Sequence, residues 1–217
     1  VQVKEQRPAG TLDPKSIVVP GVCVDYVVVA TDMKNHQQTF DTLYNEEFVS
    51  AGIVERDENA DLTPLTAKKI IARRAAMFLN PETDHVVNYG IGVPEVVAQV
   101  LSEEGQEEYF TPTVEPGIFG GTPQGGLDFG CAAFPEAIIQ QGDMFQFYNG
   151  GGIDTAFLGM AETDKAGNVN VSKFGPKIAG AGGFIDITQT AKKVIFTGTF
   201  TAKGVKYGIN EAGLTIV

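Results

Sequence analysis

The sequence predicts an α/β fold, in which a mainly parallel sheet is flanked by helices and extended by added antiparallel hairpins. Two observations lead to this prediction. Segments rich in valine and isoleucine alternate along the chain with longer segments of helical periodicity, which is the pattern of strand–helix–strand units. The 26 glycines gather after Tyr89 without a regular spacing, which indicates many tight turns between short elements.

The totals of the chain limit its partners. With 217 residues it is long enough for one large domain or two small ones. A formal charge of −11, with only isolated basic pairs, argues against a nucleic-acid surface. No apolar run is long enough for a membrane helix, so we expect no membrane association. Two cysteines without CxxC spacing, and no histidine cluster, indicate a reduced cytoplasmic protein without a metal site.

The first 62 residues predict strands followed by a surface segment. VQVKE at Val1–Glu5 and VCVDYVVVA at Val22–Ala30 are typical of strands, and the second is rich enough in valine to be buried. Thr31–Leu62 is polar and acidic, so we expect a long surface excursion there. The chain begins without Met and ends in GLTIV, which has the pattern of a strand in progress, so we expect a piece of a longer protein.

A helix is predicted at Thr63–Leu79, where the sequence is TPLTAKKIIARRAAMFL. Thr63 suits the N-cap and Pro64 the first helical position, and the following Asn80-Pro81 ends the helix. Its expected buried face carries Ile70, Ile71, Met77 and Phe78.

A compact strand–turn–helix–strand unit follows. DHVVNY predicts a strand that ends at Tyr89, GIG a turn, and VPEVVAQVLSEEG a helix from about Val93, with Pro94 in its first turn and Gly105 after its end. EEYFTPTVE predicts a second strand, which carries Glu115 at its C-terminal end. Ligands of such sheets bind at the carboxyl ends of the strands.

The last third predicts strands, a short helix and hairpins. The expected elements are strands at DMFQFYN (143–149), IDTAFLGMAE (153–162) and KKVIFTGTF (192–200), a turn TDKAGN with the return VNVSK (169–173), a short helix around DITQTA (186–191), and a final hairpin through YGINEAG (207–213).

The turn GIGVPE, Gly90–Glu95, is the first candidate for a binding loop. Free N–H groups and the dipole at a helix start attract a phosphate, a carboxylate or a developing oxyanion. Glu95 stands where a dinucleotide fingerprint needs its third glycine, and this acid would repel a pyrophosphate, so a nicotinamide or flavin cofactor is disfavoured. The other interpretation, a tight turn without a ligand, has about equal weight for this motif alone.

Glu115 is the candidate nucleophile. Pro116 fixes the chain after it, Gly117 removes steric bulk, and Gly120 and Gly121 permit close approach to the backbone. A lone glutamate after a strand is more often a solvated side chain or a cap. In this setting, however, the carboxylate can attack a carbonyl whose oxyanion is met by N–H donors. We expect these donors from GIG and from the glycine loop in YNGGG.

Other nucleophiles are less favoured. His36 and His85 have no serine or cysteine partner in a recognisable motif, and GxSxG is absent, which argues against a hydrolase triad. Cys131 follows a DFG without kinase loops and is interpreted as a structural thiol.

The ordered set of motifs resembles the second half of the family I coenzyme A transferases. It comprises GIG-VP, a glutamate in a glycine loop, GGLDFG, GGGID, DKAGNVNVSKFGPKIAGAGGFID and AKKVIFTGTF. The likeness is greatest to the short-chain acyl-CoA and propionate CoA-transferase branch. It covers nearly the whole chain and implies the coenzyme A transferase fold. By this resemblance residues 1–217 form the C-terminal, β-subunit-like domain, and residues 1–62 contain the connection from a missing N-terminal domain.

The resemblance also implies a ping-pong mechanism. In that family a glutamate, here Glu115, attacks the thioester to give an acyl-glutamyl anhydride, and the CoA thiolate converts this into a glutamyl-CoA thioester. The acceptor carboxylate then takes the CoA. Coenzyme A is a substrate, and no permanently bound cofactor or metal is implied. Family members usually have Ser, Asn or Ala where this chain has Pro116, so we expect the reactivity or pKa of Glu115 to differ.

Binding residues and partners are implied in the same way. Oxyanion and CoA contacts fall on Gly90, Ile91, Gly92, Val93 and Pro94, on Gly150, Gly151 and Gly152, and on Lys177 before AGAGG. The implied partners are a short-chain acyl-CoA, a small carboxylate such as acetate or propionate, the missing N-terminal half, and further copies in a homo-oligomer. Two alternatives stay open: a sugar-phosphate or nucleotide-binding module related to isomerases, and a CoA-ester hydrolase.

Overall fold

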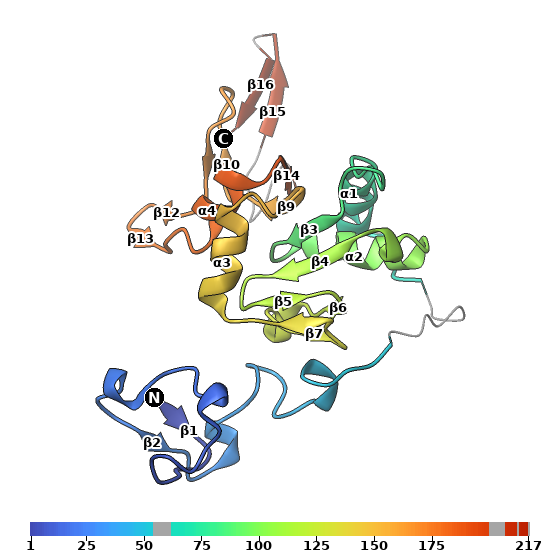
Figure 1. Cartoon of the computed structure of the whole chain (residues 1–217). Coiled ribbons are helices and arrows are strands. Elements are labelled where there is room, and N and C mark those ends of the chain that lie inside the picture. The colour runs from blue at the N-terminus through green and yellow to red at the C-terminus, as the bar shows by residue number, and fades with distance from the viewer. Residues whose placement is uncertain (54–61, 200–206, 212, 217) are drawn as a thin grey trace. The chain divides into compact units, whose positions relative to one another are not determined.

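The computed structural model describes residues 1–53, 62–199, 207–211 and 213–216 (Figure 1). The chain divides into two compact units, Val1–Glu46 and Glu47–Val217. Residues 54–61 of the expected surface excursion, and Phe200 at the end of the expected strand KKVIFTGTF, lie outside the described residues. Both cysteines, Cys23 and Cys131, are free thiols.

The N-terminal unit has little regular structure. It contains the parallel pair β1 (Gln2–Val3) and β2 (Val28–Val29) and three short 3₁₀ turns, and none of its residues is buried. The prediction of a buried strand at Val22–Ala30 is therefore wrong: only two of its residues form a strand, and Val28 is exposed. A valine-rich run is buried only where another apolar layer covers it, and this unit offers none within itself.

The C-terminal unit is built on a six-stranded sheet with the order β14-β9-β3-β4-β5-β8. β14, β9, β3 and β4 are parallel, and β5 and β8 are antiparallel additions, which confirms the predicted fold class. The bounds are β3 Val86–Tyr89, β4 Thr111–Val114, β5 Ile118–Phe119, β8 Ala137–Ile138, β9 Thr155–Gly159 and β14 Lys193–Thr197.

Among the described residues, four α-helices and four small antiparallel pairs complete the unit. The helices are α1 Ala67–Ala76, α2 Val93–Glu103, α3 Gln141–Asn149 and α4 Phe184–Thr190. The pairs are β6 Thr122–Pro123 with β7 Ala132–Ala133, β10 Glu162–Thr163 with β11 Val169–Asn170, β12 Lys173–Phe174 with β13 Lys177–Ile178, and β15 Tyr207–Asn210 with β16 Gly213–Ile216. The hairpins predicted around TDKAGN and YGINEAG are confirmed.

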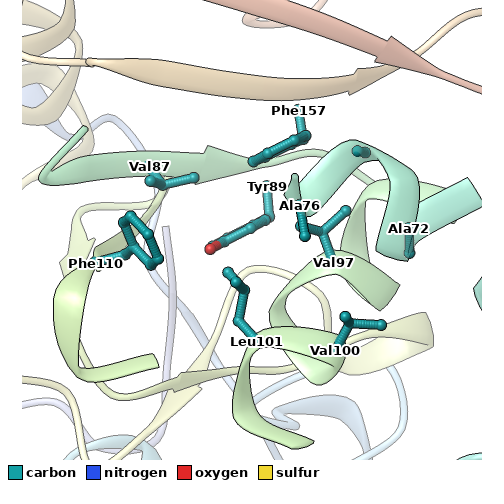
Figure 2. Close-up of a cluster of buried hydrophobic side chains, with 10 residues drawn as sticks. Ala72, Ala76, Val87, Tyr89, Val97, Val100, Leu101, Phe110 and Phe157 are labelled. Carbon is teal, nitrogen blue, oxygen red and sulfur yellow. The ribbon is translucent and has the colours of Figure 1, made fainter. Parts of the chain in front are cut away.

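Alternating side chains of the parallel strands pack against helices on both faces of the sheet. Val87, Tyr89 and Phe157 point to α1 and α2, where the Tyr89 and Phe157 rings stack at 5.7 Å between centroids (Figure 2). Ala156 and Leu158, the intervening residues of β9, pack with Met144, Tyr148 and Ile187 from α3 and α4. The sheet is thus the middle of three layers.

Helix α3 corrects the strand predicted at DMFQFYN. The alternation of aromatic residues in FQF has the period of a strand, but Met144 and Tyr148 are four residues apart and both are fully buried. In a strand Gln146 would lie on the same face as Met144 and Tyr148, but it is exposed, which is the pattern of a helix that covers the sheet with one face.

Helix α1 begins later and faces differently than predicted. Thr66, not Thr63, is the N-cap, and its side chain accepts a bond from the Lys69 N–H. The buried face consists of Lys69, Ala72, Ala75 and Ala76, whereas Ile70, Met77 and Phe78 are exposed. Small alanines allow α1 to lie close against α2, which apolar bulk on that face would prevent.

Candidate active site

The carboxyl ends of β3 and β4 bring two of the predicted site segments to neighbouring positions. Asn88 on β3 pairs with Thr113 on β4, so two residues further along each strand lie Gly90 and Glu115. Helix α2 was predicted with nearly its observed bounds, because a Gly turn, Pro94 and Gly105 mark it locally. Strand β4 is shorter than the predicted strand EEYFTPTVE, since Glu107–Tyr109 form a 3₁₀ turn before it.

The Gly90–Pro94 loop connects the end of β3 to the start of α2. Gly90 donates its N–H to Phe157 O at 2.8 Å, and a Cβ on Gly90 would stand 3.2 Å from that same oxygen. Gly92, the N-cap of α2, has φ +96° and supplies no side-chain acceptor. The amides of the first helical turn are therefore directed beyond the helix, apart from Pro94, which has none.

Glu115 stands in the tight turn between β4 and β5. Gly117 N–H closes this turn on Val114 O at 3.0 Å, and Pro116 restricts the backbone of the glutamate before it. The Glu115 residue is half-buried, but its Oε2 atom is buried and has no hydrogen-bond partner among the described residues.

Burial changes the acidity of Glu115. It raises the pKa of the Glu115 carboxyl above its ordinary value, while the backbone N–H of Glu115 and the Asn88 side chain lower it and offset part of the rise. A carboxylate with these properties is poorly solvated and more basic than usual, which are properties of an activated nucleophile.

Two glycines after Glu115, Gly117 and Gly121, serve the packing of backbone on backbone. A Cβ on Gly117 would collide with Ile139 O, and one on Gly121 with the carbonyls of Ala133 and Phe134. The Gly120 position is covered by the Glu136 side chain. Gly117, Gly120 and Gly121 thus let β5, β7 and β8 close around the turn that holds Glu115, and these three positions are not open to a ligand.

Replacing Gly117 by alanine tests this packing. The residue has φ +123°, and a Cβ would meet a main-chain oxygen that has no freedom to rotate away, so we expect a loss of about 2 kcal/mol of stability. The control is Gly126→Ala, since Gly126 also has positive φ (+64°) but no atom within 4 Å of the added Cβ. Thermal unfolding by circular dichroism should show a larger loss for Gly117→Ala; equal losses would contradict the collision.

The structure does not bring Gly150, Gly151 and Gly152 to Glu115. They follow α3 and precede β9, which places them at the amino edge of the sheet, opposite the Gly90–Pro94 loop. Their N–H groups donate to carbonyls of α3, at 2.9 Å, 2.9 Å and 3.0 Å, and end that helix. The expectation that YNGGG supplies oxyanion donors is wrong, because it depended on a strand where α3 stands.

Lys177 lies in β13 of a separate two-stranded hairpin and is exposed.

Within the described residues no group of three or more His, Cys, Asp or Glu is arranged to hold a metal ion. None of the described helices has the length and apolar character needed to cross a membrane.

Three buried polar residues next to Glu115 were missed by the sequence analysis. Asn88, Thr113 and Tyr148 are all fully buried, and they come from β3, β4 and α3. The available signal was an asparagine inside the apolar run VVNY, directly before GIG. Its partner Tyr148 was not recognisable, because it lies 60 residues away in a segment predicted as a strand.

Comparisons with known proteins give consistent relatives. The caffeate CoA-transferase of Acetobacterium woodii is 47% identical over 209 residues, which are 94% of this chain and 39% of that protein. The acetate CoA-transferase subunit beta of Escherichia coli K12 is 32% identical over 152 residues, which are 64% of this chain and 67% of the relative. No protein-family model matches the chain.

A solved structure covers the whole chain. It is the acyl-CoA transferase YdiF of Escherichia coli O157:H7 as a thioester complex with CoA, with a TM-score of 0.71, 39% sequence identity, and coverage of 100% of this chain and 38% of that one. The chain therefore spans about two fifths of the length of its most similar relatives.

Proposed function

Because the chain belongs to the family I coenzyme A transferases, we propose that it is the half of such an enzyme that carries the covalent nucleophile, Glu115. The observation that supports this most is the buried, unpartnered Glu115 Oε2 at the end of β4, one strand away from the Gly90–Pro94 loop. The proposed reaction moves CoA from a short-chain acyl-CoA to a small carboxylate.

The first half-reaction loads CoA onto the protein. A Glu115 oxygen attacks the thioester carbonyl carbon, and the C–S bond breaks. The CoA thiolate departs, and an acyl-glutamyl anhydride is formed. The thiolate then attacks the Glu115 carbonyl carbon, which releases the donor acid and forms a glutamyl-CoA thioester. The amides of Ile91, Gly92 and Val93 at the start of α2 would stabilise the developing oxyanions, since the Gly90 N–H is bonded to Phe157 O and Pro94 has none.

The second half-reaction reverses these steps with the acceptor. Its carboxylate attacks the glutamyl thioester carbonyl and expels the thiolate, which then attacks the acyl carbonyl of the new anhydride. The new acyl-CoA leaves and the Glu115 carboxylate is restored. Since thioester is exchanged for thioester, the overall free-energy change is small and no cofactor is required.

Burial of Glu115 supports this chemistry in two ways. An anhydride reacts readily with water, and the enclosed position of Oε2 limits the access of water to it. Acylation also replaces a buried negative charge by a neutral group, so the desolvation that raises the pKa of Glu115 favours the acylated state.

We further propose that activity needs an N-terminal half of the kind that the longer relatives contain, since the chain spans 39% of the caffeate CoA-transferase. The chain together with this half is called the complete enzyme below. Assembly into a homo-oligomer stays a prediction. Lys177 is proposed as a CoA contact only in the complete enzyme.

Peptide mass spectrometry tests the proposal. The complete enzyme incubated with acetyl-CoA alone should gain the mass of CoA on the peptide that contains Glu115, and hydroxylamine should convert this thioester into a hydroxamate at the same residue. Free CoA in place of acetyl-CoA is the control and should add nothing. An adduct on another residue would remove Glu115 from this role, and release of acetate without an adduct would favour hydrolysis.

A further inference from the structure

Beneath Glu115 lies a connected set of buried polar side chains on one face of the sheet. Asn88 Nδ2 donates to Thr113 O at 3.2 Å and to Tyr148 Oη at 3.3 Å. Asn88 and Tyr148 are completely buried. The Asn88 amide thus joins β3 to β4 and the sheet to α3, within the layer that carries Glu115.

The side chains of this set face the same side of the sheet as Glu115. Asn88 and Thr113 are direct partners in the parallel register, and Glu115 follows Thr113 by two residues, so all three project toward α3. The electrostatics agree with this placement. The Asn88 side chain lowers the pKa of Glu115, and besides burial, the charge of Glu115 raises the pKa of Tyr148.

The set leaves two oxygens unsatisfied. Asn88 Oδ1 and Glu115 Oε2 are both buried without a hydrogen-bond partner among the described residues. A buried amide that satisfies only its N–H₂ side destabilises a sheet compared with an apolar residue of the same size. Joining two strands does not explain it, because the strand hydrogen bonds already do so.

We propose that Asn88 and Tyr148 are positioning residues for the acylation of Glu115. The Thr113 carbonyl and the Tyr148 hydroxyl accept both N–H bonds of the Asn88 amide and hold it on the face of the sheet that carries Glu115. Held there, the Asn88 N–H₂ group favours the ionised Glu115 carboxylate that attacks the thioester. This inference rests on the proposed function and adds residues to it.

Three variants of the complete enzyme test the inference. Asn88→Leu keeps the side-chain shape without the amide, Asn88→Asp keeps the shape but adds a second acid, and Tyr148→Phe removes a single oxygen atom. We expect the rate of adduct formation from acetyl-CoA to fall about 10- to 100-fold in both Asn88 variants and about tenfold in Tyr148→Phe, with KM for acetyl-CoA within about twofold of wild type.

The pH profile separates positioning from a structural role. The Glu115 carboxylate must be ionised to react, and Asn88 favours the ionised form, so the midpoint of adduct formation should move to higher pH in Asn88→Leu and further in Asn88→Asp. The matched control is Thr155→Val, which removes another buried hydroxyl from the same sheet on its other face. This variant should form the adduct at a rate within about twofold of wild type. The pH midpoint of adduct formation should not shift.

A second measurement needs no activity. Infrared spectra of the full chain labelled with ¹³C-glutamate, with the Glu115→Gln spectrum subtracted, report the ionisation of Glu115 directly. In Asn88→Leu this band should titrate at higher pH than in wild type; an unchanged titration would overturn the inference, whether or not the adduct forms. Full-rate acylation in a folded Tyr148→Phe would also overturn it, while leaving the role of Glu115 intact.

Discussion

Glu115→Gln is expected to abolish CoA transfer in the complete enzyme, with a loss in kcat of about 10⁴-fold or more. The amide has nearly the shape of the acid but cannot form the anhydride, and no other described carboxylate is placed at the end of β4 beside the Gly90–Pro94 loop. Turnover with acetyl-CoA and a small carboxylate, followed by the appearance of the new acyl-CoA, measures the effect.

A matched variant distinguishes this loss from a general effect of removing a buried acid. Glu107 precedes the same strand, and its Oε2 is also buried without a hydrogen-bond partner in the part of the chain that the structure describes. Glu107→Gln should transfer CoA within about twofold of the wild-type rate. Comparable losses in both variants would mean that Glu115 is not the nucleophile.

The stability of Glu115→Gln gives an independent check. The folded-state pKa of Glu115 is raised, so the folded protein binds more protons than the unfolded one between the two pKa values, and stability falls as the pH rises through this window. At neutral pH the glutamine variant should therefore be more stable by about 1 kcal/mol, or about 2–4 °C in Tm. Below the ordinary pKa of glutamic acid the difference should vanish.

The parts of the fold that were predictable carry local signals. The strand before Gly90, the helix after Gly92 and the strand before Glu115 are bounded by glycine and proline, whose backbone restrictions act without the rest of the chain. Glu115 was therefore placed correctly at a strand end.

The parts of the fold and site that were not predictable depend on tertiary packing between segments that are distant in the sequence. Gly150–Gly152 looked like a binding loop only while the preceding segment was interpreted as a strand; once Met144 and Tyr148 cover the sheet as one helical face, the same glycines end a helix. In the same way, neither VVNY nor FQFYN reveals that Asn88 and Tyr148 meet. Such pairings are set by tertiary contacts and not by local sequence.

Glu103→Gln is expected to destabilise the chain by about 3 kcal/mol, which corresponds to about 6–12 °C in Tm. Glu103 near the end of α2 accepts bonds from Thr63 N at 2.8 Å and Thr63 Oγ1 at 2.5 Å, and pairs with Lys69 Nζ at 2.6 Å. The Lys69 and Glu103 side chains are only 8% and 17% exposed. Glutamine would leave the buried ammonium of α1 without its counter-charge.

The neighbouring residue provides the control. Glu104 pairs with Arg73 at 2.8 Å across the same two helices, but the Arg73 side chain is 57% exposed, so Glu104→Gln should cost less than about 1 kcal/mol. Thermal melts of both variants at neutral pH compare the buried Lys69–Glu103 pair with the exposed Arg73–Glu104 pair, which joins the same two helices. Equal decreases in Tm would show that burial does not make the Lys69–Glu103 pair more important for stability than the exposed pair.

The pH dependence of this difference follows from the acidity of Glu103. Despite the opposing effect of burial, the bonds from Lys69 and Thr63 hold the pKa of Glu103 below its ordinary value. Its stabilisation is therefore present above the unfolded-state pKa and is lost as the pH falls through the folded-state value. The gap in Tm between wild type and Glu103→Gln should close only in acid, whereas Glu115→Gln shows its gain at neutral pH. The two acids thus contribute to folding with opposite signs, because Glu103 is buried with a cation, whereas no cation among the described residues pairs with Glu115.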